Sequence, residues 1–145
     1  MNLLRRVLHR DERGQALVEF ALTLPIVLLV VTGLFDVARA VWQENTLAYA
    51  AREGTRYAIV HGAASSSPVG PNNPNEPNIS AVVRNASVGV YNITVTTTWV
   101  DGNNNRNSRI QVDASAPFVP LPSAYLLGGA FQITLRAGSQ LVIQR

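Results

Sequence analysis

The sequence predicts an α+β protein in which one long N-terminal helix precedes a small antiparallel β-sheet. Three observations predict this class. An apolar run covers residues 15–35, a helical pattern continues from it to about residue 61, and side chains alternate with period two beyond residue 92. The chain has 145 residues and no cysteine, so it has room for one small domain besides the helix, and it forms neither disulfides nor thiolate metal sites.

We interpret residues 1–14 as a basic leader peptide that precedes the apolar run. Four of the twelve arginines lie in the first thirteen residues, and the chain has no lysine. Without the leader, eight arginines face seven acidic residues, so the remaining chain is almost neutral. A nucleic-acid-binding protein carries its basic surface on the folded domain, and we therefore expect no nucleic-acid partner.

Residues 15–61 are expected to form one long helix, of which residues 16–35 span a membrane. The only ionisable side chain from Gln15 to Phe35 is that of Glu19. At about 1.5 Å per residue, twenty residues cover the roughly 30 Å of hydrocarbon in a bilayer. The basic flank predicts a cytoplasmic N-terminus and an external C-terminal domain. A cleavable secretory signal is disfavoured because the helical pattern continues past the apolar run without a small-residue cleavage site.

Further features of this helix predict contacts along its length. Phe35, Trp42 and Tyr49 recur every seven residues, which favours packing against other helices. Asp36 and Arg39 are three positions apart and are expected to pair just outside the membrane, as structural partners within or between helices. Glu53 is expected to pair in the same way with Arg56 or Tyr57.

Pro25 lies inside the apolar helix and removes one backbone hydrogen bond. Two interpretations stay open here. The proline either loosens the helix for a functional purpose or causes only a mild kink that lipid tolerates.

Residues 62–78 are rich in Pro, Ser and Asn, which predicts an exposed loop. A small C-terminal domain over residues 79–145 follows. We expect it to begin with a short amphipathic helix over residues 79–87, capped by Asn78 and packed against the sheet.

Alternating side chains predict three strands, over residues 92–99, residues 110–116 and from Phe131 toward Ile143. The strand order is left open. Prolines at 117, 120 and 122 are expected to interrupt the pattern after the second strand. The Gly- and Asn-rich residues 101–107 begin like a calcium loop, but they lack its later Gly and Glu, and a hairpin turn is the preferred interpretation.

The junction between the basic head and the apolar run resembles the processing site of type IV pilins. Residues 13–20 read RGQALVEF. In those proteins a membrane peptidase cuts after a glycine, and the fifth residue of the mature chain is glutamate; with Gln15 as the first mature residue, Glu19 is the fifth. Residues 14–57 are moreover similar to TadE-like proteins of the tight-adherence pilus. The matching features are GQALVEFAL, the position of Pro25, the Asp36 to Arg39 spacing and the run AAREGTR over residues 50–56.

The resemblance implies roles for several residues. A prepilin peptidase would cut between Gly14 and Gln15, and Glu19 and the new amine of Gln15 would serve subunit assembly. That amine is positively charged near or below its pKa of about 8, and it would neutralise Glu19 of a neighbouring subunit inside an apolar bundle. Pro25 would supply helix flexibility, because this region of related pilins is thought to stretch in the filament. The alternative for Glu19 is a carboxylate that extends to water at the membrane surface.

The expected function is that of a structural subunit, major or minor, of a type IV tight-adherence pilus that supports surface adhesion. Its partners would be the prepilin peptidase, other pilin subunits, the assembly ATPase with its inner-membrane platform, and the cytoplasmic membrane before release into an extracellular filament. The alternative is a permanently anchored single-span protein whose external β domain binds a ligand or partner. No plausible catalytic set is evident in the sequence, so we expect no enzymatic activity, cofactor or metal site.

Overall fold

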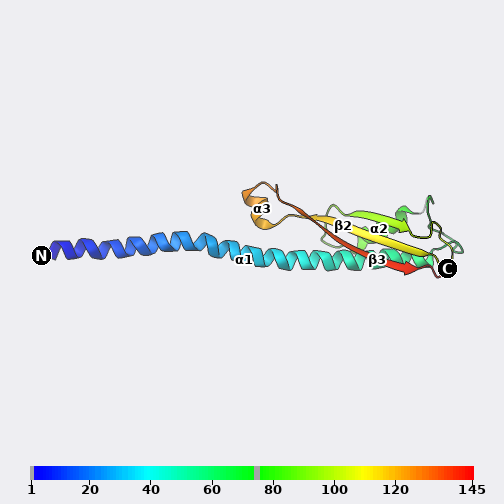
Figure 1. Cartoon of the computed structure of the whole chain (residues 1–145), viewed down its shortest axis with the longest axis horizontal. Coiled ribbons are helices and arrows are strands. Elements are labelled where there is room, and N and C mark those ends of the chain that lie inside the picture. The colour runs from blue at the N-terminus through cyan, green and yellow to red at the C-terminus, as the bar shows by residue number, and fades with distance from the viewer. Residues whose placement is uncertain (1, 74–75) are drawn as a thin grey trace.

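A long helix and a small sheet domain make up the structure, a computed structural model that describes residues 2–73 and 76–145, with side chains from residue 14 onward. The elements, in chain order, are α1 (Asn2–Val60), α2 (Pro77–Ala86), β1 (Thr94–Trp99), β2 (Arg109–Phe118), α3 (Leu121–Leu126) and β3 (Ile133–Val142). The sheet and α2 gather around the C-terminal half of α1, α3 lies near its middle, and most of its N-terminal half projects beyond the domain (Figure 1). The predicted α+β class is confirmed.

Helix α1 has 59 residues, and at about 1.5 Å per residue it is roughly 90 Å long. It ends at Val60, one residue before the expected end, and the loop that begins at His61 follows. At its other end the helical backbone also covers residues 2–14, the predicted leader. Pro25 lies inside the helix without ending it, although its missing N–H leaves the carbonyl of Ala21 without the usual helical donor.

The sheet has three strands in the order β1-β2-β3, and both pairs are antiparallel. The register places Thr97 opposite Val112 in the first pair and Val112 opposite Ser139 in the second. Strand β2 alternates between buried and more exposed positions, as its period-two pattern predicts. Its buried side chains are those of Ile110, Val112, Ala114, Ala116 and Phe118.

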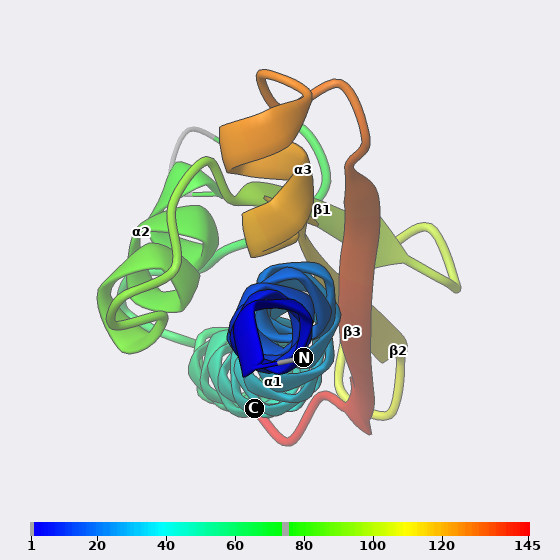
Figure 2. The ribbon, with the colours of Figure 1, turned by 90° about the vertical axis from the view of Figure 1, so that its left-hand side faces the viewer.

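The core forms where α1 lies between the sheet and α2 (Figure 2). Small and medium side chains of α1 supply its centre, namely Leu47, Ala50, Ala51 and Ala58, all fully buried. Helix α2 adds Ile79 and Val83, which face α1. Helix α2 was expected to pack against the sheet; it does contact β1, but its contacts are chiefly with α1.

Helix α2 begins two residues earlier than predicted. Its N-cap position is Glu76, not Asn78, and Pro77 occupies the first helical turn. Proline suits this place because its fixed φ matches the helix and the position needs no N–H donor. The carboxylate of Glu76 makes no capping bond and instead accepts a 3.0 Å hydrogen bond from the indole Nε1 of Trp99.

Strand β2 passes through Pro117, where an interruption was expected. Pro117 lies opposite Thr134 of β3, beyond Ser115, the last residue of β2 that pairs with β1. Its carbonyl accepts a 3.3 Å hydrogen bond from Nε2 of Gln43, so the backbone polar atoms of this residue face the edge that β1 has left free. A proline is tolerated at such an edge because no ladder bond requires its N–H.

The segment after β2 also differs from the expectation. The proline-rich connection contains α3, a helix that the sequence pattern did not predict. Strand β3 begins at Ile133 instead of Phe131. Phe131 and Ile133 are exposed, whereas Leu135 and Ala137, which follow with the same period of two, pack against the core. This end of the sheet extends past the residues of α1 that form the core.

Candidate functional site

The predicted processing segment lies on the free part of α1. Gly14 is exposed and helical, and a side chain placed there would meet nothing within 4 Å. Gln15 and Glu19 are exposed one helical turn apart, and Gln15 Nε2 donates to Glu19 Oε1 at 3.3 Å. The side chains of the basic residues predicted for the leader lie outside the described ones. The segment is therefore accessible to another protein at Gly14, and a neutral amide is the group that contacts Glu19.

The apolar surface that follows is uncovered. Every large apolar side chain from Leu17 to Leu34 is at least 41% exposed, and none of the apolar window is buried inside the molecule. In the described part of the chain this is the one helix that is long and apolar enough to cross a membrane. Helices with such an uncovered apolar surface require either lipid or other protein around them.

Three aromatic side chains continue this surface: Phe35 at the end of the apolar run, and Trp42 and Tyr49 beyond it. They form what we call the aromatic stripe, and each is more than half exposed. One edge of the Trp42 ring packs against Gly89. A Cβ added to Gly89 would lie 2.8 Å from the Trp42 ring. Within the described part of the chain, no other helix covers the aromatic stripe, although the sequence predicted that it packs against other helices.

Asp36 is the most enclosed of the carboxylates that α1 carries from residue 14 onward, with only 8% of its surface exposed. Its Oδ1 accepts a 2.8 Å bond from Nη1 of Arg39, so the predicted pair forms within the helix. Its Oδ2 accepts a 2.7 Å bond from the backbone N–H of Leu121, at the start of α3. The guanidinium of Arg39 also lies 5.2 Å from the ring centre of Phe118. The sequence predicted the pair but not its attachment to α3, because that attachment is a contact between distant segments.

The run from Ala50 to Arg56 is the part of the TadE resemblance that packs into the domain. A Cβ on Gly54 would lie 2.5 Å from Cγ2 of Val83 and 3.3 Å from Cγ1 of Val112, so the glycine allows α2 and β2 to approach α1 closely. Next to it, the buried hydroxyl of Thr55 donates to Ser139 Oγ of β3 at 2.9 Å. Glu53 pairs with Arg56 at 3.3 Å. This run is a docking surface for the sheet domain.

The turn between β1 and β2 holds an ion pair between Asp101 and Arg109. Asp101 Oδ1 accepts from Nη2 of Arg109 at 2.7 Å, and its Oδ2 accepts from the backbone N–H of Arg109 at 2.7 Å. The Arg109 side chain, and then its N–H, lower the pKa of Asp101 below its ordinary value. Within the same turn, Oδ1 of Asn103 accepts hydrogen bonds from the backbone N–H of Asn105 and from the hydroxyl of Ser108. The hairpin-turn interpretation is confirmed.

No cluster of three His, Asp or Glu side chains able to hold a metal ion occurs among the residues whose positions are described. His61 follows α1, and its Nδ1 lies 2.7 Å from the carbonyl oxygen of Tyr57 while its ring stacks on the Tyr57 ring at 4.0 Å. The imidazole thus takes part in closing the end of the helix.

A comparison with protein families gives one match: the model of TadE-like proteins matches residues 14–56. The predicted resemblance is confirmed over this segment, which contains the apolar helix and links the chain with the tight-adherence pilus. The matched segment begins at Gly14 and ends at Arg56, so it includes both the predicted cleavage position and the run from Ala50 to Arg56 that packs into the domain. No curated protein and no solved structure matches the chain.

Proposed function

From its TadE-like segment we propose that this protein is a structural subunit of a tight-adherence pilus, anchored in the membrane by α1 and then packed into a filament by the same helix. The observation that carries the proposal is the uncovered apolar half of α1, with Glu19 as the only ionisable side chain between Gln15 and Phe35. A stable chain needs an apolar environment for this surface, and a bilayer and a bundle of neighbouring helices both supply one.

Processing after Gly14 accounts for the placement of Glu19. A carboxylate inside an apolar environment is costly unless it is paired. Among the described side chains, the hydrogen-bond partner of its carboxylate is the neutral amide of Gln15, at 3.3 Å. Cleavage after Gly14 creates a positively charged amine on Gln15, and that amine on one subunit neutralises Glu19 on the next. The pair favours one axial stagger between neighbouring helices.

The aromatic stripe extends the subunit contact beyond the membrane. Phe35, Trp42 and Tyr49 recur every seven residues, and each remains more than half exposed in the single chain. Neighbouring subunits in a filament cover these side chains after the helix has left the membrane. The sheet domain then faces outward, where it serves surface adhesion, and the protein acts without catalysis of its own.

Assembly requires other components. The prepilin peptidase removes residues 1–14, and the assembly ATPase with its inner-membrane platform extracts the subunit from the bilayer. The subunit enters the filament as a major or minor component. The other candidate is a permanent single-span anchor for the β domain, which has the same exposed helix but needs no cleavage.

The mass of the N-terminus distinguishes these functions. Filaments sheared from cells are purified, and the terminal peptide is measured in the wild type and in Gly14→Ala. A wild-type chain that begins at Gln15 supports the pilus subunit, and Gly14→Ala is expected to keep its leader. Gly33→Ala, another helical glycine with open space around it, is the matched control and should be processed normally. An intact Met1 in membranes without filaments would support the permanent anchor.

A further inference from the structure

Between Asp113 and Arg136 the chain has no Asp, Glu, Lys, Arg or His, although this stretch belongs to the folded half of the molecule. Its centre is what we call the α3 arm, residues 119–132, which connects β2 with β3 through α3. Four large side chains of the arm are exposed, by 58% to 83%, namely Tyr125, Leu126, Leu127 and Phe131. An uncharged arm with so much apolar surface points to an apolar partner.

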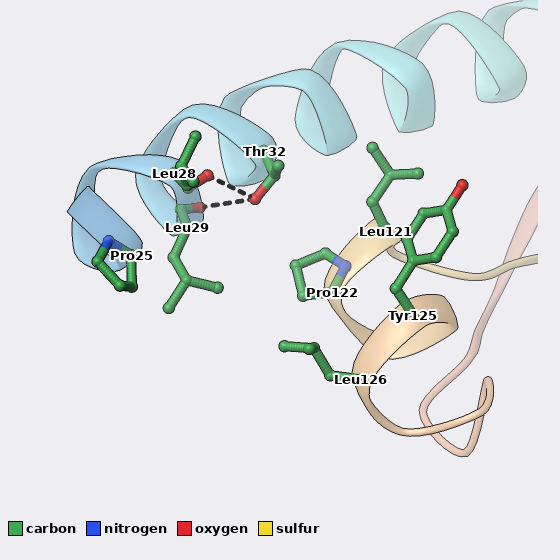
Figure 3. A pocket seen from close by; sticks show the side chains of 8 residues that line it. All are labelled: Pro25, Leu28, Leu29, Thr32, Leu121, Pro122, Tyr125 and Leu126. Atoms are coloured by element: carbon green, nitrogen blue, oxygen red, sulfur yellow. Dashed lines mark hydrogen bonds between the residues drawn. The ribbon is translucent and has the colours of Figure 1, made fainter. Parts of the chain in front are cut away.

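The arm lies beside the part of α1 that is predicted to cross the membrane (Figure 1). An open apolar groove of about 390 Å³ separates them, lined by four residues of each helix, and Figure 3 shows their side chains on its two sides. On α1 these residues are Pro25, Leu28, Leu29 and Thr32; on α3 they are Leu121, Pro122, Tyr125 and Leu126.

The depth in the bilayer of the α1 residues that face the arm follows from the rise per residue of the helix. For a span that ends at Phe35, Thr32 and Leu28 lie about 5 and 10 Å inside its outer end, at about 1.5 Å per residue. A bilayer around the span therefore reaches the side of α1 that the arm faces. The charged pair of Asp36 and Arg39 begins one residue beyond this end, where charged groups meet water.

Several backbone groups of the arm have hydrogen-bond partners within the arm or on α1. Ser123 Oγ donates to the carbonyl of Phe131 at 2.8 Å and accepts from its N–H at 2.9 Å. The N–H of Gly129 donates to the carbonyl of Ser123 at 2.9 Å, and the N–H of Leu121 donates to Asp36 at 2.7 Å. Two residues of the arm are prolines, which have no N–H to satisfy. Irregular backbone enters the hydrocarbon region only when its polar groups have such partners.

We infer that the α3 arm inserts into the outer leaflet of the bilayer beside α1 while the subunit is anchored, with lipid acyl chains filling the groove. Lipid is the occupant for two reasons. The groove is continuous with the exposed apolar surface of the span, and the α1 residues that line it lie within the predicted membrane-spanning segment. Tyr125 suits the interface, where amphipathic rings concentrate. The arm is thus a second membrane contact that sets the depth and rotation of the sheet domain. This inference rests on the proposed membrane-anchored stage.

The absence of native cysteine allows a direct test, because a single introduced cysteine carries the only label. The full chain is reconstituted in phosphatidylcholine and phosphatidylglycerol vesicles with an environment-sensitive fluorophore at Leu126→Cys. The side chain of Leu126 is 72% exposed, so the label displaces no packed group. Val27→Cys, near the middle of the span, and Ser66→Cys, in the exposed loop after α1, are the matched controls. Spin-labelled lipids with the nitroxide near the headgroup or deep in the acyl chain quench the fluorescence.

We expect the label at position 126 to emit at short wavelength and to be quenched more by the shallow nitroxide than by the deep one. The label at 27 should be quenched most by the deep nitroxide, and the label at 66 by neither. Emission at 126 that matches position 66, with 27 quenched, would overturn the inference and leave the membrane anchor intact. Absence of quenching at 27 would overturn both. A short-wavelength signal at 126 that lipids do not quench and that disappears on dilution with lipid would assign the arm to a second copy of the chain, against the inference.

Discussion

The carboxylate of Asp36 accepts a 2.7 Å hydrogen bond from the backbone N–H of Leu121, which lies 85 positions later in the chain. One side chain of the long helix thereby caps the short helix of the arm, while its other oxygen holds Arg39. This contact joins the end of the apolar span to the sheet domain. It connects the long helix and the C-terminal domain, which sequence patterns predict as two separate parts.

Replacing Asp36 with alanine is expected to release the arm. The change removes an acceptor at the start of α3, and the loss of a cap of this kind costs about 1 kcal/mol. Hydrogen exchange measured by mass spectrometry on the full chain in detergent should become faster in peptides that cover residues 119–131. Glu53→Ala breaks an exposed pair on the same helix and is the control, with little expected effect. Unchanged exchange in Asp36→Ala would show that the arm is held by other contacts.

Gly54→Ala should destabilise the domain, although alanine favours helices by about 1 kcal/mol over glycine. The new methyl group would lie 2.5 Å from Val83, a buried and branched side chain that has little freedom to move. Overpacking of this kind costs about 1–3 kcal/mol. Denaturant unfolding followed by tryptophan fluorescence measures the change. Gly33→Ala adds the same methyl group where nothing lies within 4 Å, and equal stability of the two variants would contradict the close approach.

Arg109→Gln should raise the pKa of Asp101 part of the way toward its ordinary value. The side-chain bond from Arg109 is the main cause of the lowered pKa, whereas the backbone N–H of residue 109 remains in the variant. NMR titration of the Asp101 carboxyl measures both values. A carboxyl with a lowered pKa contributes stability that is complete above about pH 4 and is lost as the pH falls through the folded-state pKa. The variant should therefore show a smaller loss of hairpin stability on acidification, and an identical pKa in both proteins would exclude the ion pair in solution.

Glu19→Gln should be processed normally but enter filaments poorly. The amide is nearly the size of the carboxylate and keeps a hydrogen-bonding group beside Gln15, yet it lacks the charge that the proposed pairing with a neighbouring N-terminus requires. The amount of subunit in sheared filaments, relative to the mature subunit in membranes, measures assembly. Glu44→Gln lies on an exposed position of the same helix outside the span and should assemble like the wild type. Assembly of Glu19→Gln at wild-type level would refute the proposed charge pair.

Local patterns in the sequence determined the long helix, the Asp36–Arg39 pair and the alternation of the strands. Each depends on residues a few positions apart, whose spacing alone places them on one face. The apolar run and Glu19 are features of this kind, and for that reason the resemblance could be recognised from residues alone.

The remaining features depend on contacts between segments that are distant in the sequence. Helix α3 is too short to show a period and begins where Asp36 supplies a cap from a distant segment. Pro117 continues β2 because β1 has already ended beside it, and Gly54 is required because Val83 and Val112 converge there. Each of these features depends on which distant residues come into contact. Tertiary packing determines those contacts, and the local spacing of residues does not. The position of the uncharged arm beside the apolar part of α1, on which the inferred second membrane contact rests, follows from the same cause.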